Sequence, residues 1–453
     1  MATSPMLGYS EGTAAEVAAR LDRLPTGPWH RRVVALMGIG TFFNFFEVGL
    51  GSLLVTLVPA GWVESTADKS LVIGSAFVGE LLGALFLAPL SDRFGRRRMF
   101  QVNLLAYAGL SLVCTLAPGL AVFLLLRVLV GVGLGAELVL VDTYLSELVP
   151  AARRGRLVGM CYFIGWLALP ASAVLAAFLP HTLLGIESWR WLLIFSALGA
   201  ALVWFTRRGL SESPRWLAAQ GRRAEALAVL REIEGPGNPP AERPSIADSP
   251  AKAAPIRPHL LRRPLLGRTA LACLVWACQT IGVLGFSSIA PLVLIHKGFG
   301  VLHSLGYTAA TACGFPLGAA LVVLLAERFQ RKHLLVLSSV LVAASGATFG
   351  LATSGWLVVA AGTALNVFNV VMGNLSHAYT PELFPTAVRT TAAGRTYSLS
   401  RLVSAVFPFA ALPLLYSLGA GVLFSVCAVL ILAMSVGVAV FGPRTNARQL
   451  DTI

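Results

Sequence analysis

Charged residues are scarce in this chain, and acidic residues are the scarcest of them. Only 12% of the 453 residues are Asp, Glu, Lys or Arg, whereas 56% are hydrophobic. A typical soluble domain carries about 25% charged residues. The composition therefore argues against an ordinary soluble protein and indicates a chain that lies mostly within a lipid bilayer.

The sequence also lacks the patterns of several chemical sites. Its six cysteines are scattered through apolar segments, without a CxxC pair or a metal-ligand spacing. It has no phosphate-binding loop, no metal cluster and no nucleophile triad. We therefore expect no enzyme activity, no metal and no cofactor. Residues 1–28 are polar and contain no apolar core, so we expect no cleavable signal peptide.

Basic residues are in excess, and their distribution explains why. The chain has 35 Lys and Arg against 21 Asp and Glu, a formal net charge of +14. We assign 29 of the basic residues to tails and loops on one side of a membrane, and only Lys69, Arg190 and Lys297 to the other. This positive-inside asymmetry predicts that both termini are cytoplasmic, and it accounts for the charge without a nucleic-acid partner.

Twelve apolar runs approach or exceed the roughly 20 residues that a spanning helix needs. In the first half they cover residues 33–58, 70–90, 99–117, 119–145, 156–179 and 189–206. In the second half they cover residues 268–295, 302–326, 333–353, 355–380, 389–416 and 418–441. We expect a tail (1–32), a six-helix bundle (33–206), a cytoplasmic linker (207–267), a second six-helix bundle (268–441) and a tail (442–453).

The linker begins with a helical pattern. Ser213 and Pro214 open it, and apolar residues recur through Ile233, with basic residues on the other side. We expect an amphipathic helix along the cytoplasmic face. After Gly235 the chain is rich in proline, and we expect a flexible linker there.

An internal repeat organises the chain. The segment Ser91-Asp92-Arg93-Phe94-Gly95-Arg96-Arg97-Arg98 has a counterpart 235 residues later, Glu327-Arg328-Phe329-Gln330-Arg331-Lys332. A second pair, Glu147 to Arg154 and Glu382 to Arg389, has the same offset. Two motifs that share one offset indicate two copies of one membrane unit, which is a signature of secondary transporters.

These motifs resemble those of the major facilitator superfamily, over nearly the whole chain. The resemblance rests on the Asp92 loop, on the Arg127-x-x-x-Gly131-x-Gly133-x-Gly135 pattern, on the two Glu–Arg loops and on Ser211-Glu212-Ser213-Pro214-Arg215-Trp216-Leu217. The last segment is similar to a sugar-porter signature, with Ser211 in place of its first proline. The resemblance implies an all-α protein of twelve helices in two pseudo-symmetric bundles, a monomer that works by alternating access in a bacterial-type inner membrane.

The resemblance also implies a proton site. Relatives of this branch commonly protonate an acidic residue at the position of Glu47 and pair it with an arginine at the position of Arg127. They often have a second acidic residue where this chain has Asn44, which cannot titrate. Independently, a charge inside a bilayer is costly and is a functional candidate by default. A static ion pair that joins two helices is the alternative for Glu47 and Arg127.

Arg401 is the main candidate for the substrate site. It lies 12 residues into the 389–416 run, about 18 Å from the end of a helix. A guanidinium at that depth needs an anion, either a protein carboxylate or a substrate. The stretch Gly394 to Leu402 also resembles transporters of organic ions, nicotinate and aromatic acids, in which an arginine often stands at this position.

Aromatic and amide side chains complete the predicted pocket. The repeat places Tyr397 opposite Tyr162 and Arg401 opposite Trp166. With these we group Asn44, Trp276, Gln279, Phe286, Phe315, Asn366 and Asn369. Taken singly, each aromatic residue is as well explained by packing. As a set they predict a site for a small or flat organic acid.

The remaining intramembrane charges have less specific roles. We expect Glu137 and Asp142 to hold helix ends and loop arginines, and Arg395 to reach the cytoplasmic surface or close the gate. No partner for Glu80 is evident, so it is either a second titrating site or a residue that faces water. The loop motifs predict a cytoplasmic gate made of Asp92, Arg93, Arg96, Glu147, Arg154, Glu327, Arg328, Arg331, Glu382 and Arg389.

We therefore expect a proton-coupled symporter that takes up a small organic anion and has the substrate, protons and the lipid bilayer as its partners. A proton-coupled sugar or polyol porter is the first alternative, which more polar groups on the 268–295 and 355–380 runs would favour. A drug or metabolite exporter is the second. A membrane sensor would need a large soluble domain, which the expected short tails do not provide.

Overall fold

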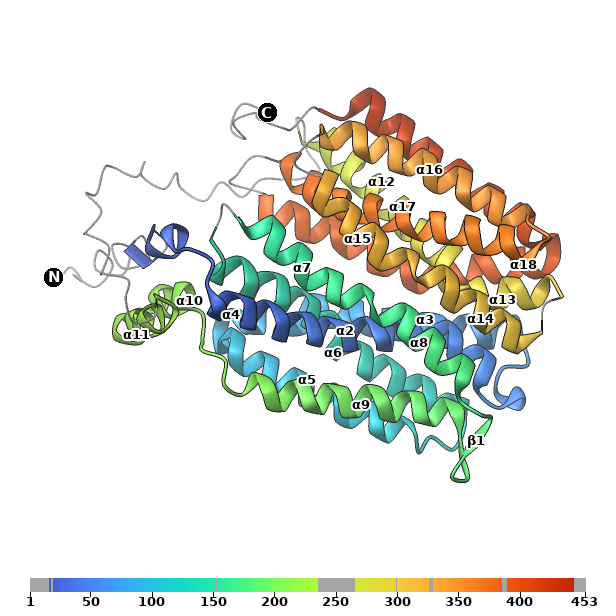
Figure 1. Ribbon diagram of the computed structural model, residues 1–453, viewed down its shortest axis with the longest axis horizontal. Coiled ribbons are helices and arrows are strands. Elements are labelled where there is room, and N and C mark those ends of the chain that lie inside the picture. The colour runs from blue at the N-terminus through green and yellow to red at the C-terminus, as the bar shows by residue number, and fades with distance from the viewer. Residues whose placement is uncertain are drawn as a thin grey trace.

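The computed structural model describes residues 16–17, 19–150, 153–234, 265–298, 300–325, 329–384 and 389–443. Figure 1 shows an almost wholly helical molecule in two bundles, the first half coloured blue to green and the second yellow to red. The linker helices α10 and α11 lie at one end, and the hairpin of β1 (Thr182–Leu183) and β2 (Ile186–Glu187) lies at the other. We call these the linker end and the hairpin end.

The first bundle contains six helical passes. They are α2 (Pro28–Leu57), α3 (Thr66–Leu82) continued by a π-helical turn (Gly83–Leu87), α5 (Arg96–Cys114), α6 (Leu120–Leu148), α7 (Arg154–Trp166) with α8 (Ala168–Phe178), and α9 (Ser188–Arg207). Two short elements join them, a 3-10 turn (Ala60–Trp62) and α4 (Leu90–Phe94).

The second bundle has the same plan. Its passes are α12 (Leu266–Gly282) with a π-helical turn (Val283–Ser288) and α13 (Ala290–His296), α14 (Val301–Ala312) with α15 (Gly314–Leu325), α16 (Arg331–Leu351), α17 (Gly355–Glu382) and α18 (Arg389–Phe441). The helix α18 is two passes that meet at Gly419, whose φ of 84° is one that glycine adopts without steric cost.

The repeat seen in the sequence is repeated in the helix boundaries. The helices α14, α16, α17 and α18 begin 235 residues after α3, α5, α6 and α7, respectively. Residues at this offset are called equivalent below. Each half is therefore one copy of the same structural unit.

Nine helical stretches in the described part of the chain are long and apolar enough to cross a membrane. The last, Gly394–Phe441, holds two passes because of the break at Gly419. Two more passes fall outside the nine. The helix α5 opens with Arg96, Arg97 and Arg98, and the α12–α13 pass is broken into three pieces. Together they make the twelve passes that the apolar runs predict.

The linker differs from the prediction. The expected single amphipathic helix is two helices, α10 (Pro214–Ala219) and α11 (Arg223–Glu234). They separate at Gly221, whose φ of 75° ends α10 with a left-handed turn. Their apolar side, including Leu217 and Leu230, packs into a core cluster with Val17 and Leu21. The proline-rich stretch after Gly235 lies outside the described residues.

Small residues let the helices approach closely where the site is built. A Cβ on Gly79 of α3 would lie 2.0 Å from the Val128 carbonyl oxygen, and one on Gly131 of α6 would lie 2.1 Å from that of Ala76. Such backbone-to-backbone contact is typical of helices packed within a membrane. It holds α3 firmly against α6.

Candidate functional site

Glu47 and Arg127 form a fully buried ion pair. Glu47 lies in the middle of α2, Arg127 lies in α6, and both side chains are 0% exposed. Arg127 donates to Glu47 Oε1, and the Ser111 hydroxyl of α5 donates to Oε2 over 3.3 Å. The structure thus brings together the two residues that the sequence suggested as a pair.

The partner of Arg401 is Glu80, which corrects the expectation that Glu80 has none. Arg401 Nη1 lies 2.7 Å from Glu80 Oε2. Glu80 belongs to α3 in the first bundle and Arg401 to α18 in the second, so the pair joins the two halves. We call this contact of α3 with α18 the ion-pair seam. The side chain of Arg401 is 17% exposed, whereas that of Glu80 is 0% exposed.

Tyr397 and two further rings surround Arg401. Arg401 Nη2 donates to the Tyr397 hydroxyl, one turn earlier on α18. The Tyr397 ring contacts that of Trp276 on α12 edge to face, with centroids 4.8 Å apart. His377 of α17 contacts the same indole at 4.6 Å and Tyr397 at 5.4 Å. The sequence reasoning missed His377.

The first bundle presents an equivalent pair of side chains. The Tyr162 hydroxyl of α7 donates to Asp142 Oδ1 of α6 over 2.7 Å, which replaces the loop arginine expected for Asp142. Tyr162 is equivalent to Tyr397, and Asp142 is equivalent to His377. Asp142 and His377 are both exposed although they belong to helices of the bundle interior. The repeat offset, applied to Asp142, would have identified His377.

Aromatic residues occupy the position equivalent to the ion pair. Trp166 is equivalent to Arg401, and Phe315 is equivalent to Glu80. Their rings stack with centroids 5.2 Å apart and planes 3° from parallel. This contact joins α7 of the first bundle to α15 of the second, and we call it the aromatic seam. Phe45 of α2 packs on the other side of Trp166 at 4.7 Å.

Two indole N–H groups near this site have no acceptor. Among the described residues, nothing accepts a hydrogen bond from Trp166 Nε1 or Trp276 Nε1, and both atoms are buried. A buried donor without a partner is costly, so such groups mark places where a ligand can supply an acceptor.

The three asparagines of the predicted pocket are engaged elsewhere. The side-chain amide of Asn44 donates to the Leu134 carbonyl, that of Asn366 to Thr311, and that of Asn369 to Gly282, over 2.9–3.0 Å. Each bond ties two helices of one bundle together. Gln279 is half-buried beside Gly373. Phe286 packs on Phe424 inside the second bundle.

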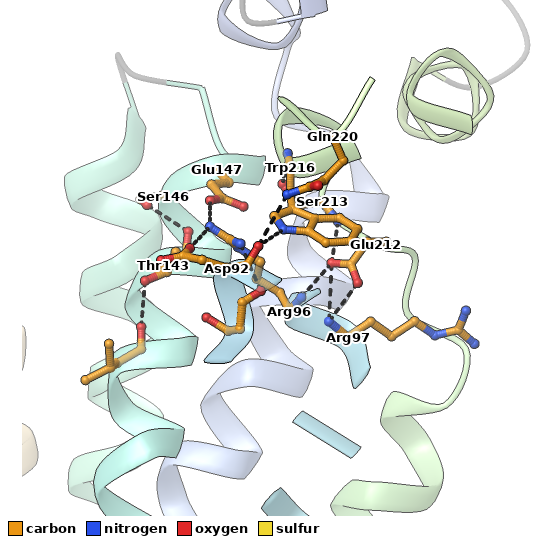
Figure 2. A network of polar contacts seen from close by, with 12 residues as sticks. Asp92, Arg96, Arg97, Thr143, Ser146, Glu147, Glu212, Ser213, Trp216 and Gln220 are labelled. Carbon is orange, nitrogen blue, oxygen red and sulfur yellow. Dashed lines mark hydrogen bonds and ion pairs between the residues drawn. The ribbon is translucent and has the colours of Figure 1, made fainter. Parts of the chain in front are cut away.

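A polar network joins the loop motifs to the linker (Figure 2). Arg96 Nη2 lies 2.8 Å from Asp92 Oδ1 and 2.9 Å from Glu147 Oε1. Trp216 Nε1 of α10 donates to the Asp92 carbonyl oxygen over 2.9 Å, and the backbone N–H groups of Arg96 and Arg97 donate to Glu212. The linker helices are thus attached to the first bundle at its motif loop.

The second bundle repeats the central contact of this network. Arg331 pairs with Glu382, as the equivalent Arg96 pairs with Glu147. Arg93 is exposed and lies over the Phe94 ring, and Arg154 is half-buried. Glu327, Arg328 and the side chain of Arg389 lie outside what the structure describes. Arg395 is exposed near the linker end of α18.

Arg207 is not a linker residue, although the sequence placed it there. It ends α9 and is 0% exposed, as is its partner Glu137 of α6. Its guanidinium also lies over the Phe100 ring, 4.9 Å from the centroid, and donates to the Leu36 and Met37 carbonyl oxygens. Glu137 thus has the arginine partner that was expected, but within the bundle.

Polar contacts between the bundles lie at the ion-pair seam or nearer the hairpin end, in the part of the chain that the structure describes. Lys69 Nζ contacts the Tyr416 hydroxyl at 3.3 Å, and the Ser70 hydroxyl donates to the Pro408 carbonyl oxygen over 3.1 Å. The motif network described above stays within one bundle or its linker. The halves are therefore joined at the hairpin end, while Asp142 and His377 are exposed on the linker side.

The described side chains offer no metal site, because no group of three or more His, Cys, Asp or Glu residues gathers among them. What the site contains is one membrane-buried cation with a partly open face, unpaired N–H donors and aromatic rings. It can bind an anion that carries a flat apolar body.

Comparison with known proteins agrees with this architecture. Residues 33–453 match the family described as "Sugar (and other) transporter". The chain is 31% identical to YyaJ of Bacillus subtilis (strain 168), named for metabolite transport, over 96% of this chain and 97% of that protein. It is 26% identical to the niacin transporter NiaP of Acinetobacter baylyi (strain ATCC 33305 / BD413 / ADP1), over 97% and 99%.

A solved structure shows the same fold. The xylose transporter XylE from E. coli, in a partially occluded inward open conformation, superposes with a TM-score of 0.73 at 19% identity, covering 93% of this chain and all of that one. The predicted all-α architecture of twelve helices in two bundles is confirmed. The chain belongs to the sugar (and other) transporter family of the major facilitator superfamily, and it is a membrane-spanning metabolite transporter rather than an enzyme.

Proposed function

We propose that this transporter takes up a small organic anion, an aromatic or other carboxylate, together with protons. The observation that carries the proposal is Arg401, a guanidinium deep in the membrane at the seam between the bundles, with one face partly open. A planar guanidinium suits a carboxylate, which it can bind through two parallel hydrogen bonds. Tyr397 and Trp276 beside it supply flat surfaces and an unpaired N–H donor.

The relatives support this substrate class. Niacin, for which NiaP is named, is an aromatic ring that carries one carboxylate. A sugar or polyol is the alternative substrate, which the family description includes. Its many hydroxyl groups need many polar partners, but the amides of Asn44, Asn366 and Asn369 already bond to helix carbonyls. This arrangement favours the organic anion.

Glu47 and Arg127 are the proton-coupling pair in this proposal. Making the pair stabilises the charged carboxylate, and separating it in a dry interior favours the protonated form. A movement of α2 against α6 that opened the pair would therefore load a proton, and its closure would release one. The pair has no charged equivalent in the second bundle, where Gly282 and Gly362 occupy these positions.

The bundles of residues 33–206 and 268–441 act as the two moving bodies of alternating access. The basic excess places the linker end and both termini in the cytoplasm of a bacterial-type inner membrane. The network of Asp92, Arg96 and Glu147, with its counterpart at Arg331 and Glu382, serves as the cytoplasmic gate. We propose that the protein works as a monomer, since each chain contains both bundles and the whole site.

The test is uptake into proteoliposomes of labelled nicotinate, benzoate and glucose, with and without an inward proton gradient. Wild type should accumulate an acid only with the gradient. Glu47→Gln should exchange acid across the membrane without accumulating it, and Arg401→Ala should lose acid uptake. Arg395→Ala is the matched control, an exposed arginine of the same helix, and should behave as wild type. Glucose uptake that survives Arg401→Ala would contradict the organic-anion proposal.

A further inference from the structure

We infer that the substrate carboxylate takes the place of Glu80 on Arg401, and that Glu80 binds a proton as it is displaced. The inference rests on the proposed function, since it concerns the same arginine. It adds a second proton-binding carboxylate, next to the substrate, to the Glu47 site proposed above.

The two partners of the pair differ in access. The side chain of Arg401 is 17% exposed and that of Glu80 is 0% exposed. An anion that arrives between the bundles can therefore reach the guanidinium but not the carboxylate behind it. The Glu80 oxygens lie close to Arg401 but accept no well-aligned hydrogen bond from any described group. A competing carboxylate that aligned with the guanidinium could form the bonds that Glu80 does not.

The surroundings of a displaced Glu80 favour a proton. Besides Arg401 and Tyr397 of α18, the charged group that acts on it is Arg127 of α6, and Glu47 of α2 already holds Arg127. Asp142, farther along α6, is engaged by Tyr162. A buried carboxylate that loses its cation is costly, and it becomes neutral by binding a proton.

Charge balance then couples the two ligands. Before binding, the Glu80 carboxylate neutralises the Arg401 guanidinium. Afterwards the substrate carboxylate neutralises Arg401, and Glu80 carries one proton, so an anion and a proton enter together and the net charge of the site is unchanged. By thermodynamic linkage each ligand favours the binding of the other. The empty carrier keeps its internal pair, so it never exposes an unpaired buried charge.

Only one seam responds in this way among the described contacts between the bundles. The position equivalent to Glu80 and Arg401 holds the stacked rings of Phe315 and Trp166, which carry no charge. Exchange of the counter-ion therefore loosens the link between α3 and α18 while the aromatic seam stays packed. Substrate binding thus acts directly on one of the two contacts that must change when the carrier reorients.

The test measures proton uptake when nicotinate or benzoate binds to the purified full-length protein, in weakly buffered detergent with a pH-indicator dye. Glu80→Gln should take up about one proton fewer per bound acid than wild type, by linkage. It should also bind the acid at least about fivefold more tightly at pH 7.5, because the competing carboxylate is gone. Wild-type affinity should weaken as pH rises, by up to about tenfold per unit, and that of Glu80→Gln should not.

Two variants serve as controls. Glu47→Gln should keep the proton that belongs to Glu80. Glu137→Gln removes another fully buried carboxylate with an arginine partner, Arg207, and should take up as many protons as wild type. If Glu80→Gln does not fold, the infrared difference spectrum of wild type should gain a protonated-carboxyl band on acid binding, and that band should shift in Glu80→Asp.

The outcomes separate the two proposals. Arg401-dependent binding of acid with unchanged proton uptake in Glu80→Gln, or no new carboxyl band in wild type, would overturn the inference and leave the proposed function standing. If wild type binds none of the acids, the proposed function fails and the inference fails with it. Tighter, pH-independent binding in Glu80→Gln with loss of the proton supports both.

Discussion

Trp166 and Phe315 stack face to face across the interface of the bundles, at the position that the repeat makes equivalent to Arg401 and Glu80. One architecture thus carries two kinds of contact, an aromatic stack and an ion pair. The stack is insensitive to charge, whereas the ion pair responds to any competing anion. This difference makes the pseudo-symmetric scaffold chemically asymmetric where the substrate is proposed to bind.

The stack should contribute a measurable coupling energy. We expect Trp166→Ala and Phe315→Ala to be non-additive by about 0.5–1.5 kcal/mol in a double-mutant cycle, the range for aromatic pairs. The measurement is the free energy of unfolding by denaturing detergent. Phe123→Ala is the control, because Phe123 packs on Trp62 and Trp189 instead. Its combination with Trp166→Ala should be additive within about 0.5 kcal/mol, and equal coupling in both cycles would remove the stack from the interface argument.

The Glu47–Arg127 pair should be costly to break from one side. Arg127→Leu leaves a buried carboxylate without its cation, and we expect it to lower the free energy of unfolding by about 3–5 kcal/mol. The double variant with Glu47→Leu removes both charges and should recover much of that loss. Thermal unfolding in detergent provides the comparison. A double variant that is less stable than Arg127→Leu would show that the charges are not coupled as the structure implies.

Gly131 should not tolerate a side chain. A Cβ there would lie 2.1 Å from the Ala76 carbonyl oxygen and 3.0 Å from Gly79 Cα. Both neighbours are backbone atoms, so α3 and α6 would have to separate, which costs at least the roughly 1–3 kcal/mol of an overpacked core. We expect Gly131→Ala to lose most of the yield of monodisperse protein on size-exclusion chromatography.

Gly109→Ala is the matched control for that experiment. A Cβ at Gly109 of α5 would meet nothing within 4 Å. Alanine also favours a helix over glycine by up to about 1 kcal/mol. The control should therefore be as stable as wild type or slightly more stable. Loss of folded protein in both variants would point to helix backbone effects rather than to close packing.

Glu212, in the segment between α9 and α10 and outside the spanning helices, should make stability depend on pH. Burial raises the pKa of its carboxyl, and backbone N–H donors from Ser213, Arg97 and Arg96 oppose this in part. With the pKa higher in the folded state, the folded protein binds more protons than the unfolded chain. The free energy of unfolding therefore falls as pH rises from the ordinary value of 4.5 through the raised pKa.

Glu212→Gln should flatten this part of the pH profile of the unfolding temperature. Glu225→Gln is the control, because Glu225 is exposed and pairs only with Arg222 at the surface. That variant should keep the wild-type slope. A profile that is unchanged in Glu212→Gln would mean that the docking of the linker helices does not depend on the charge of Glu212.

Much of the fold could be read from the sequence. The apolar runs lie within a few residues of the observed passes, and the offset of 235 residues fixed four helix starts in the second half. The breaks were harder to see. The run 268–295 looks continuous, but Pro291 lies in the first turn of α13 and the helix before it loosens into a π-helical turn. Local backbone geometry, rather than hydropathy, decided these breaks.

The site could be read only in part. The sequence singled out Glu47, Arg127, Arg401, Tyr397 and Tyr162 because polar groups stand out in apolar runs. It did not show that the asparagine amides bond to helix carbonyls, since a buried amide has the same letter whether it faces a ligand or a neighbouring backbone. His377 was missed because its equivalence to Asp142 is visible only when the offset is applied to every polar residue.

The sequence by itself determined the membrane setting, the twelve passes and the two-fold repeat, because these follow from hydropathy and spacing along one chain. Tertiary structure alone decided which charges meet. Glu80 and Arg401 are 321 positions apart and belong to different bundles, so no local pattern connects them. Each buried charge needs an opposite charge nearby, but only the packing of α3 against α18 decides which one it finds.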